Sequence, residues 1–319
     1  MIHFRPFRNT DPPHLVEIWR AQRRFSSLTS TVSVAILEAT IFGKPYFDPA
    51  GLILALEDDR PLGFIHAGHA WDRDGNDLDK QEGIICQLRV VPGERQQEVS
   101  DGLMKSAIDY LKASGAKQIF FGSKFPCSPF YLGLYGGSRV PGVAESDDQA
   151  VSACEKFGFS TTSDIVVFRR SLVGFRTVVD RRQMKVRRAY QIRADADPSL
   201  QSWSEACTMG KNQRMRFSLI DRRNDSVRGS VSYWDMEPIA NSWGVTAMGM
   251  YNLNVDDEAR REGLATFLVG ESVRHLASQS IGMIEAQTTS TNDPTCGLLD
   301  KLGFERFAVG QQAVLSLGE

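Results

Sequence analysis

Apolar residues along the chain follow two patterns, and these patterns alternate in the same order in each half of the sequence. Residues 84–91 and 250–255 have the alternating or continuous apolar character that is typical of strands. Each of these segments leads into a stretch where apolar residues recur every three or four positions, as on one face of a helix. The apolar positions of the two stretches are Val99, Leu103, Ala107 and Leu111, then Leu264, Phe267, Leu268 and Leu276. The pattern predicts a strand followed by an amphipathic helix in each half.

Both halves continue with the same further elements. Residues 117–121 and 283–288 are compatible with short strands, and each precedes a second helix with a similar tail. The tails are Phe157-Gly158-Phe159 and Leu302-Gly303-Phe304, where glycine is placed to end a helix in the left-handed conformation. Upstream, apolar pairs around a polar turn predict one hairpin in each half, at residues 51–66 and 216–233. The sequence therefore predicts one α/β fold used twice.

Length and charge agree with two domains and exclude several classes of partner. The chain has 319 residues, and its 37 basic and 39 acidic side chains leave a formal net charge of -2. This balance offers no basic surface for bulk binding to nucleic acid or to an anionic membrane. The longest apolar runs fall far short of the roughly 20 residues of a membrane helix, and the first residues lack the order of a signal peptide. We expect a cytoplasmic protein without nucleic-acid or membrane partners.

Cysteine and histidine residues give no sign of a metal site or of disulfides. The five cysteines are odd in number and form no CxxC pair. His66 and His69 lie close together in the sequence, but no third or fourth ligand follows at a convincing spacing. We therefore expect reduced thiols and no metal.

A basic stretch separates the two halves. Residues 169–193 contain nine basic side chains against one acid. Such a run is typical of a solvated or salt-bridged connector, and the alternative is that it binds an acidic ligand. The domain boundaries predicted from this pattern are residues 1–174 for the first domain, 175–187 for a basic linker and 188–319 for the second domain.

The start of the helix in the second half has the features of an anion-binding site. Residues 260–265 read Arg-Arg-Glu-Gly-Leu-Ala, directly after the predicted strand. The first N–H groups of a helix have no partner within the helix and carry the positive end of its dipole. Gly263 and Ala265 leave this backbone uncovered, so that a phosphate can approach. The spacing matches neither a Rossmann fingerprint nor a P-loop.

The pattern [Arg/Gln]-x-x-Gly-x-[Gly/Ala], placed after a strand and followed by Asn292 and the Leu-Gly-Phe tail, resembles the GNAT (Gcn5-related N-acetyltransferase) family. Strand, helix and tail occur in register twice, so the resemblance covers nearly the whole chain as a tandem of two GNAT domains. It implies that each domain has a central mixed, mostly antiparallel sheet flanked by helices. It also implies an N-acetyltransferase that moves the acetyl group of acetyl-CoA directly to a small-molecule or peptide amine.

The resemblance assigns coenzyme residues to the second half. It implies that a splayed strand bonds the pantetheine arm and that the following backbone N–H groups hold the pyrophosphate. The residues concerned are Leu253, Val255, Arg260, Arg261, Glu262, Gly263, Leu264, Ala265, Thr266 and Asn292. In the first half, Glu98 takes the place of Gly263, and a carboxylate there repels a pyrophosphate. We expect a degenerate first domain, unless Glu98 points aside and leaves a second site open.

The sequence leaves the catalytic acid and base undecided. The position that carries a tyrosine acid in many GNAT proteins is Leu299 in the second half and Cys154 in the first. Tyr251 and Glu285 are the nearest candidates for a base, although Glu285 also suits an outward-facing position on a strand. A strong base is not obligatory, because proximity supplies much of the rate. The competing hypothesis is a non-catalytic module that binds or senses acyl-CoA.

The first half also carries a long insertion. Between its arginine and its tail it has about 20 residues more than the second half, a length typical of a functional or a separately packed loop. We place the extra residues within 122–149. Our hypothesis is that Phe130, Tyr131 and Tyr135 wall a cleft for the acceptor, and the alternative is that the loop only packs on its own domain.

Overall fold

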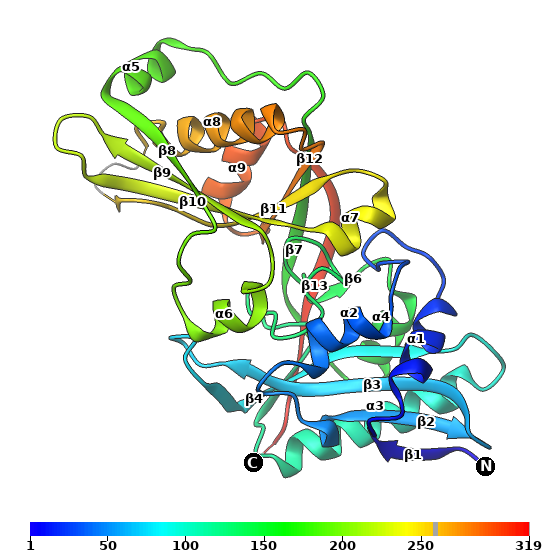
Figure 1. The fold of residues 1–319 in the computed structure, drawn as a ribbon. Coiled ribbons are helices and arrows are strands. Elements are labelled where there is room, and N and C mark those ends of the chain that lie inside the picture. The colour runs from blue at the N-terminus through cyan, green and yellow to red at the C-terminus, as the bar shows by residue number, and fades with distance from the viewer. Residues whose placement is uncertain (258–260, 319) are drawn as a thin grey trace.

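The computed structural model describes residues 1–257 and 261–318, and the thirteen strands found there form one continuous sheet (Figure 1). The strands that the first half contributes before its insertion are β1 (His3–Pro6), β2 (Leu52–Glu57), β3 (Arg60–Trp71), β4 (Leu78–Val90) and β5 (Gln118–Phe121). The second half repeats this run with β8 (Tyr190–Ala196), β9 (Arg214–Asp221), β10 (Val227–Asp235), β11 (Ala247–Val255) and β12 (Met283–Thr289). In each run the last two strands are parallel and the others antiparallel, which confirms the mixed, mostly antiparallel sheet.

Helices flank the sheet in both halves. Those of the first half are α1 (Pro12–Arg20), α2 (Val34–Leu37), the π-helical turn η1 (Glu38–Phe42), the 3-10 turn η2 (Pro49–Gly51), α3 (Gln96–Ala113) and α4 (Asp148–Lys156). Those of the second half are α5 (Arg181–Ala189), α6 (Trp203–Met209), α7 (Glu237–Trp243), α8 (Leu264–Ser278) and α9 (Asp293–Lys301). The apolar faces predicted for α3 and α8 are buried against the strands of their own halves. Apolar burial of this kind is what holds an amphipathic helix on a sheet.

Each half is completed by a strand of the other half. Strand β7 (Ser160–Ser171) ends the first half, yet it pairs with β12 of the second half. Strand β13 (Glu305–Ser316) ends the chain and pairs with β5 of the first half. Between these outer partners, β7 and β13 pair with each other. Figure 1 shows the red β13 running from the second half into the first, where the C-terminus lies.

Because of this exchange, the two predicted domains are not separate units in space. The boundaries at residues 174 and 188 mark the repeats along the chain, whereas in space each repeat contains a strand of the other. Part of the segment predicted as a basic linker is helical, because α5 begins at Arg181. The two glycine tails are as predicted, since Gly158 and Gly303 follow α4 and α9 with φ of 74° and 73°.

The insertion of the first half folds into the interface between the halves. It contains the short strand β6 (Val143–Ala144), which pairs with β13. Backbone and side-chain contacts connect it to the second half: the indole nitrogen of Trp234 donates to the carbonyl of Ser138, and the amide of Gln287 donates to the carbonyl of Arg139. Within residues 1–257 and 261–318, no helix is long and apolar enough to cross a membrane.

Candidate functional site

Strands β11 and β12 part from each other and leave an opening in the sheet of the second half. Their parallel pairing runs only from Ala247 to Gly249 on β11, opposite Met283 to Glu285 on β12. Beyond that point β11 continues beside β10 with a bulge at Asn252, whose φ is 50°. A bulge bends a strand and interrupts its ladder of hydrogen bonds. The geometry agrees with the splayed strand expected to accommodate a pantetheine arm.

The backbone at the start of α8, which follows β11 in the chain, has the geometry of an anion-binding site. Arg261 and Gly263 both have positive φ, 62° and 86°, so the chain turns sharply before the helix begins at Leu264. The N–H of Phe267 is bonded to the carbonyl of Gly263, and the N–H groups of the three preceding helical residues have no carbonyl partner within the helix. Such groups favour a phosphate. Residues 261–266 therefore suit the expected pyrophosphate, whereas Arg260 lies outside the described residues.

Helix α5 lies against this turn. The side-chain amide of Gln183 donates to the carbonyl of Gly263 at 3.2 Å. A Cβ at Gly263 would come within 3.2 Å of the Arg182 side chain, so an arginine from the basic stretch is a direct neighbour of the turn. The surroundings of the turn are thus positively charged, as an anion site requires.

The corresponding turn of the first half is absent, because helix takes its place. When Arg95 is aligned with Arg260, Val99 corresponds to Leu264, yet α3 already begins at Gln96. The extra helical turn includes Glu98, which accepts two hydrogen bonds from the Arg95 guanidinium, at 2.9 and 3.0 Å. Arg95 also pairs with Glu57. This ion cluster occupies the position of the second-half anion site.

In the first half, a side chain bonds to the end of the corresponding strand, beside a hollow of about 350 Å³ between β4, α3 and α4. The Gln149 side chain accepts from the N–H of Val90 at 3.1 Å and donates to its carbonyl at 2.8 Å. Val90 aligns with Val255, one of the residues expected to bond the pantetheine arm. Beneath it, Arg89 and Asp147 form a fully buried ion pair. The protein's own side chains take up the polar groups that a coenzyme would use in this half.

Two other predicted coenzyme residues flank the opening of the second half. Leu253 is packed against the core beneath α8, so its backbone is what can face a ligand. Asn292 caps α9: its side chain accepts from the N–H of Thr295 and donates to the hydroxyl of Thr288 at the end of β12. The structure places both residues beside the opening, and their contacts with a coenzyme stay predictions.

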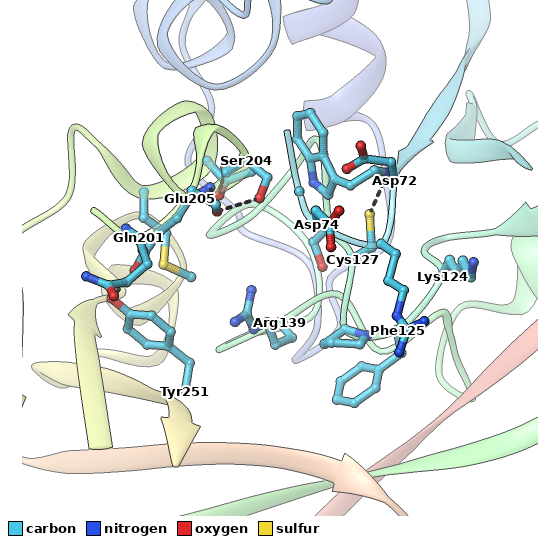
Figure 2. Close-up of a pocket in the computed structure, with 18 of the residues that line it drawn as sticks. Asp72, Asp74, Lys124, Phe125, Cys127, Arg139, Gln201, Ser204, Glu205 and Tyr251 are labelled. Atoms are coloured by element: carbon cyan, nitrogen blue, oxygen red, sulfur yellow. Dashed lines mark hydrogen bonds between the residues drawn. The ribbon is translucent and has the colours of Figure 1, made fainter. Parts of the chain in front are cut away.

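A cavity of about 670 Å³ lies between the two halves, on the face of β11 opposite α8 (Figure 2). This volume is in the range of sites for small molecules. The first half contributes the turn between β3 and β4 and parts of the insertion, and the second half contributes α6 and β11. Its charged lining residues are Asp72, Arg73, Asp74, Asp79, Glu82, Lys124, Arg139 and Glu205. The lining of the cavity thus offers both positive and negative side chains to a charged ligand.

Tyr251 and Glu205 form a hydrogen-bonded pair in this cavity. The Tyr251 hydroxyl donates to Glu205 Oε1 at 3.2 Å, and the N–H of Gln201 donates to the other carboxylate oxygen at 2.7 Å. Tyr251 follows the last paired residue of β11 by two positions, so its ring stands where β11 and β12 begin to part. Burial and the nearby Glu205 raise the pKa of Tyr251 to about 12. Its hydroxyl therefore keeps its proton at neutral pH and donates it in the hydrogen bond to Glu205.

Arg139 reaches into the middle of the same cavity. Figure 2 shows it between Tyr251 on one side and Phe125 on the other. Its guanidinium carbon lies 5.4 Å from the centre of the Tyr251 ring. Within the described part of the chain, no hydrogen bond or ion pair joins this guanidinium to a protein group. Burial lowers the pKa of Arg139, since its charged form loses contact with water.

Glu285, the second candidate base, serves another purpose. Its carboxylate is fully buried, accepts from Arg169 Nε at 2.9 Å and accepts from the N–H of Ser138 at 2.7 Å. Arg169 is itself held between the rings of Trp243 and Phe307. Glu285 does not line the cavity. The interpretation of Glu285 as a base is therefore replaced by a structural one, in which it fixes the insertion to the second half.

The insertion shapes the cavity, but not with the aromatic side chains predicted to do so. Tyr131 and Tyr135 are 1% and 2% exposed and belong to the core of the first half. The Tyr131 hydroxyl bonds to His66, and the Tyr135 hydroxyl accepts from the N–H of Ala144. Phe130 packs on His66 and lines two other hollows. None of these three rings lines this cavity, to which the insertion contributes residues 124–128 and Arg139 instead.

Two residues of the cavity that contact Tyr251, Glu205 and Arg139, are not predicted from the sequence. Glu205 stands three residues after Ser202, and this spacing is typical of a helix cap, which the structure also shows. A residue in a helix cap is not by itself a catalytic candidate. Arg139 is one arginine in a long loop, and only the fold shows that it faces Tyr251. By contrast, Leu299 and Cys154, at the family's tyrosine position, are both buried in the core.

Comparison with known proteins agrees with this architecture. The model of the acetyltransferase (GNAT) family matches residues 14–132 and 183–304, which together make up most of the chain. A comparison with curated protein sequences finds no match. Solved structures are similar at low sequence identity, and such similarity concerns the fold alone.

Three of these structures extend over essentially the whole chain. A tandem GNAT protein from the clavulanic acid biosynthesis pathway is 12% identical, with a TM-score of 0.67 over 100% of this chain and 99% of its own. A GCN5-related N-acetyltransferase from Sphaerobacter thermophilus is 12% identical, with a TM-score of 0.63 over 99% and 95%. The glucosamine N-acetyltransferase region of a fungal GH3 β-N-acetylglucosaminidase is 15% identical, with a TM-score of 0.65 over 99% and 38%. With both halves matched by the same family model, this chain belongs to the GNAT family of acetyltransferases, as a tandem of two GNAT units.

Proposed function

We propose that the protein is an N-acetyltransferase that binds acetyl-CoA in its second half and acetylates an amine held in the cavity between the halves. The observation that carries this proposal is the Tyr251–Glu205 pair, which stands in the cavity at the point where β11 and β12 part. A thioester reached through that opening and an amine in the cavity would meet at this pair. Such an arrangement supplies proximity, which is worth much of the rate in direct transfer.

The difference between the two halves supports a single coenzyme site. The second half has the sharp turn, the N–H groups at the helix start without a partner within the helix, and the neighbouring Arg182. The first half has an extra turn of helix, the Arg95–Glu98 ion pair and a glutamine side chain bonded to Val90. The described residues contain no group of His, Cys, Asp and Glu side chains suited to a metal ion. The cosubstrate we propose is therefore acetyl-CoA, one molecule per chain.

The two residues of the pair have separate roles in the transfer. The acceptor amine attacks the carbonyl carbon of the thioester, a C–N bond forms and the C–S bond breaks. Glu205 takes the proton that the amine loses, and the Tyr251 hydroxyl is placed to give a proton to the departing thiolate. The raised pKa of Tyr251 keeps that proton in place until it is needed. The acceptor is a small-molecule or peptide amine.

Release of free thiol from acetyl-CoA, measured with a panel of primary amines, tests the activity. Acetyltransferase activity requires thiol release that depends on both the amine and the protein. A protein that binds acetyl-CoA by calorimetry but releases no thiol with any amine would be the non-catalytic acyl-CoA module. The absence of the family's tyrosine at Leu299 and Cys154 is the observation that favours this alternative.

Replacement of Tyr251 by phenylalanine and of Glu205 by glutamine is expected to lower kcat about 100-fold each, in the range of general acid–base catalysis. Both changes keep the shape of the site, and the glutamine oxygen can still accept from the Gln201 N–H. The affinity for acetyl-CoA is expected to stay the same. Because the pKa of Tyr251 is about 12, the rate is expected to show no Tyr251-dependent change between pH 6 and 10.

Tyr110→Phe is the matched control. The Tyr110 hydroxyl also donates to a carboxylate, that of Asp48, but Tyr110 does not line the cavity. It is expected to retain wild-type kcat. Normal turnover in Tyr251→Phe and Glu205→Gln would contradict the proposed roles and leave proximity as the source of the rate.

A further inference from the structure

Within the described residues, the Arg139 guanidinium has the Tyr251 ring and the more distant Glu205 near it, but no salt bridge or hydrogen bond to a protein group. It projects from the insertion of the first half into the cavity and is only partly exposed. The acidic residues of the cavity do not approach it closely enough for an ion pair: Glu82 pairs with Lys124, and Glu205 bonds to Tyr251 and Gln201. A sheltered cation without a partner is costly to a protein. A ligand that brings an anion would remove that cost.

The backbone that carries Arg139 is rigidly held. Its carbonyl accepts from the Gln287 amide at 3.0 Å, and the preceding Ser138 bonds through its N–H to Glu285 and through its carbonyl to Trp234. There is no room for a side chain at Gly137, because a Cβ there would come within 1.9 Å of the Glu285 carboxylate. Three residues of the second half thus fix the position of an arginine from the first. A group positioned in advance binds its ligand at a lower cost in entropy.

Arg139 and Glu205 both contact Tyr251, Arg139 over the ring and Glu205 at the hydroxyl. The guanidinium carbon is 5.4 Å from the Tyr251 ring centre, and Glu205 is bonded to the hydroxyl of the same ring. The site therefore presents a cation and an anion close together. The complement of this arrangement is a small zwitterion, with an ammonium group facing Glu205 and an anion facing Arg139. The planar fork of arginine matches a carboxylate with two parallel hydrogen bonds.

The phosphates of the coenzyme are not the partner of Arg139. They are expected at residues 261–266, beyond the end of β11 at Val255. Val255 is four positions beyond Tyr251 along the strand, which corresponds to about 13 Å. The anion at Arg139 must therefore come from the acceptor.

We propose that the acceptor is an amino acid or a similar amine with a nearby carboxylate, and that Arg139 binds this carboxylate. The inference rests on the proposed acetyltransfer and specifies its substrate class. It assigns a role to the insertion, which delivers Arg139 to the active site of the other half. The turn Asp72-Arg73-Asp74 in the lining of the cavity has one net negative charge, which favours the approach of the ammonium end of such a molecule.

Acetylation of matched pairs of amines, with and without the carboxylate, tests this proposal. The pairs are L-phenylalanine with phenethylamine, L-leucine with isopentylamine and L-lysine with cadaverine, within a panel of all twenty amino acids and spermidine. The wild-type protein is expected to prefer the carboxylate-bearing member of the best pair at least tenfold in kcat/KM. Arg139→Gln is expected to raise the KM of that amino acid about 30-fold or more, since a sheltered charge pair is lost. Arg139→Lys is expected to restore part of the affinity, because it keeps the charge without the fork.

Two readouts separate this role from a structural one. Arg139→Gln is expected to lower kcat/KM at least tenfold more for the carboxylate-bearing member of a pair than for the decarboxylated amine, and to leave the affinity for acetyl-CoA unchanged. Arg24→Gln, which removes an exposed arginine that does not line the cavity, is the matched control and is expected to behave as wild type. Equal rates for both members of every pair, or a preference for spermidine or cadaverine, would overturn the proposal and leave the acetyltransferase itself intact.

A binding measurement keeps the proposal testable if no amine is acetylated. Calorimetry compares the N-acetyl derivatives of glycine, leucine and phenylalanine with the corresponding amides, which lack the negative charge. Binding of an N-acetyl amino acid that exceeds that of its amide in wild type, and that is lost in Arg139→Gln, supports the carboxylate site without turnover. Equal binding of acid and amide, or no binding of either, overturns it.

Discussion

Replacing Gly263 with glutamate is expected to abolish acetyl-CoA binding, with a loss of affinity of about a thousandfold. The change copies the residue of the first half, Glu98, into the turn of the second. A carboxylate about 4 Å from a phosphate near a protein surface costs about 4 kcal/mol, which corresponds to that factor. Gly263 also has a φ of 86°, where any side chain adds strain of about 1–2 kcal/mol. Calorimetry with acetyl-CoA measures the affinity, and thermal unfolding measures the strain.

Gly93→Glu is the matched control for this variant. Gly93 precedes α3 in the first half, and a Cβ there meets no atom within 4 Å. The same charge is added near the other helix start, where we expect no coenzyme. Acetyl-CoA affinity is expected to stay at its wild-type value. Undiminished affinity in Gly263→Glu, or a large loss in Gly93→Glu, would place the coenzyme elsewhere.

Glu285→Ala is expected to lower the free energy of unfolding by about 3–5 kcal/mol. The substitution leaves the Arg169 guanidinium buried without its counter-charge, and removal of one partner of a buried ion pair has costs of this size. It also leaves the N–H of Ser138 without its acceptor. Glu285→Gln keeps an oxygen for that N–H, so its loss is expected to be smaller. Urea unfolding of both variants measures the difference.

Glu271→Ala is the control for the effect of losing a carboxylate. Glu271 pairs with Arg187 and Arg274, but both arginine side chains are mostly exposed, and such pairs contribute at most about 1 kcal/mol. If Glu285 were the catalytic base instead, its variants would unfold like the wild type and lose only kcat. That pattern would contradict the structural role described above.

Much of the fold follows from local patterns in the sequence. The amphipathic positions of α3 and α8, the hairpins and the two glycine tails depend on neighbours a few residues away, and each is found where it is predicted. The same holds for the turn at Gly263, because a positive φ before a helix is a local requirement that glycine satisfies. In the first half, Glu98 replaces this glycine, and a helix stands where the turn would be.

The exchange of β7 and β13 could not be predicted in this way. Each strand has an apolar pattern that suits several partners, and its actual neighbours are separated from it by a large part of the chain. Which strands pair is decided by the packing of the whole sheet. Two repeats are therefore visible in the sequence, but the strand that each one supplies to the other is not.

The same limit applies to the residues of the candidate site. Glu285 stood out as a charge in a mostly apolar strand, but its partners, Arg169 and Ser138, come from the other half. Glu205 and Arg139 acquire their meaning only next to Tyr251, to which neither is close in sequence. The aromatic residues of the insertion were conspicuous because of their size, and size is what places Tyr131 and Tyr135 in the core.

A crystal structure of the protein with acetyl-CoA tests the division of labour between the two halves most directly. We predict one coenzyme molecule per chain, with its pyrophosphate on the backbone of residues 261–266, its pantetheine arm between β11 and β12, and its thioester facing Tyr251. A coenzyme bound between β4 and α3 of the first half, or one molecule in each half, would contradict this assignment.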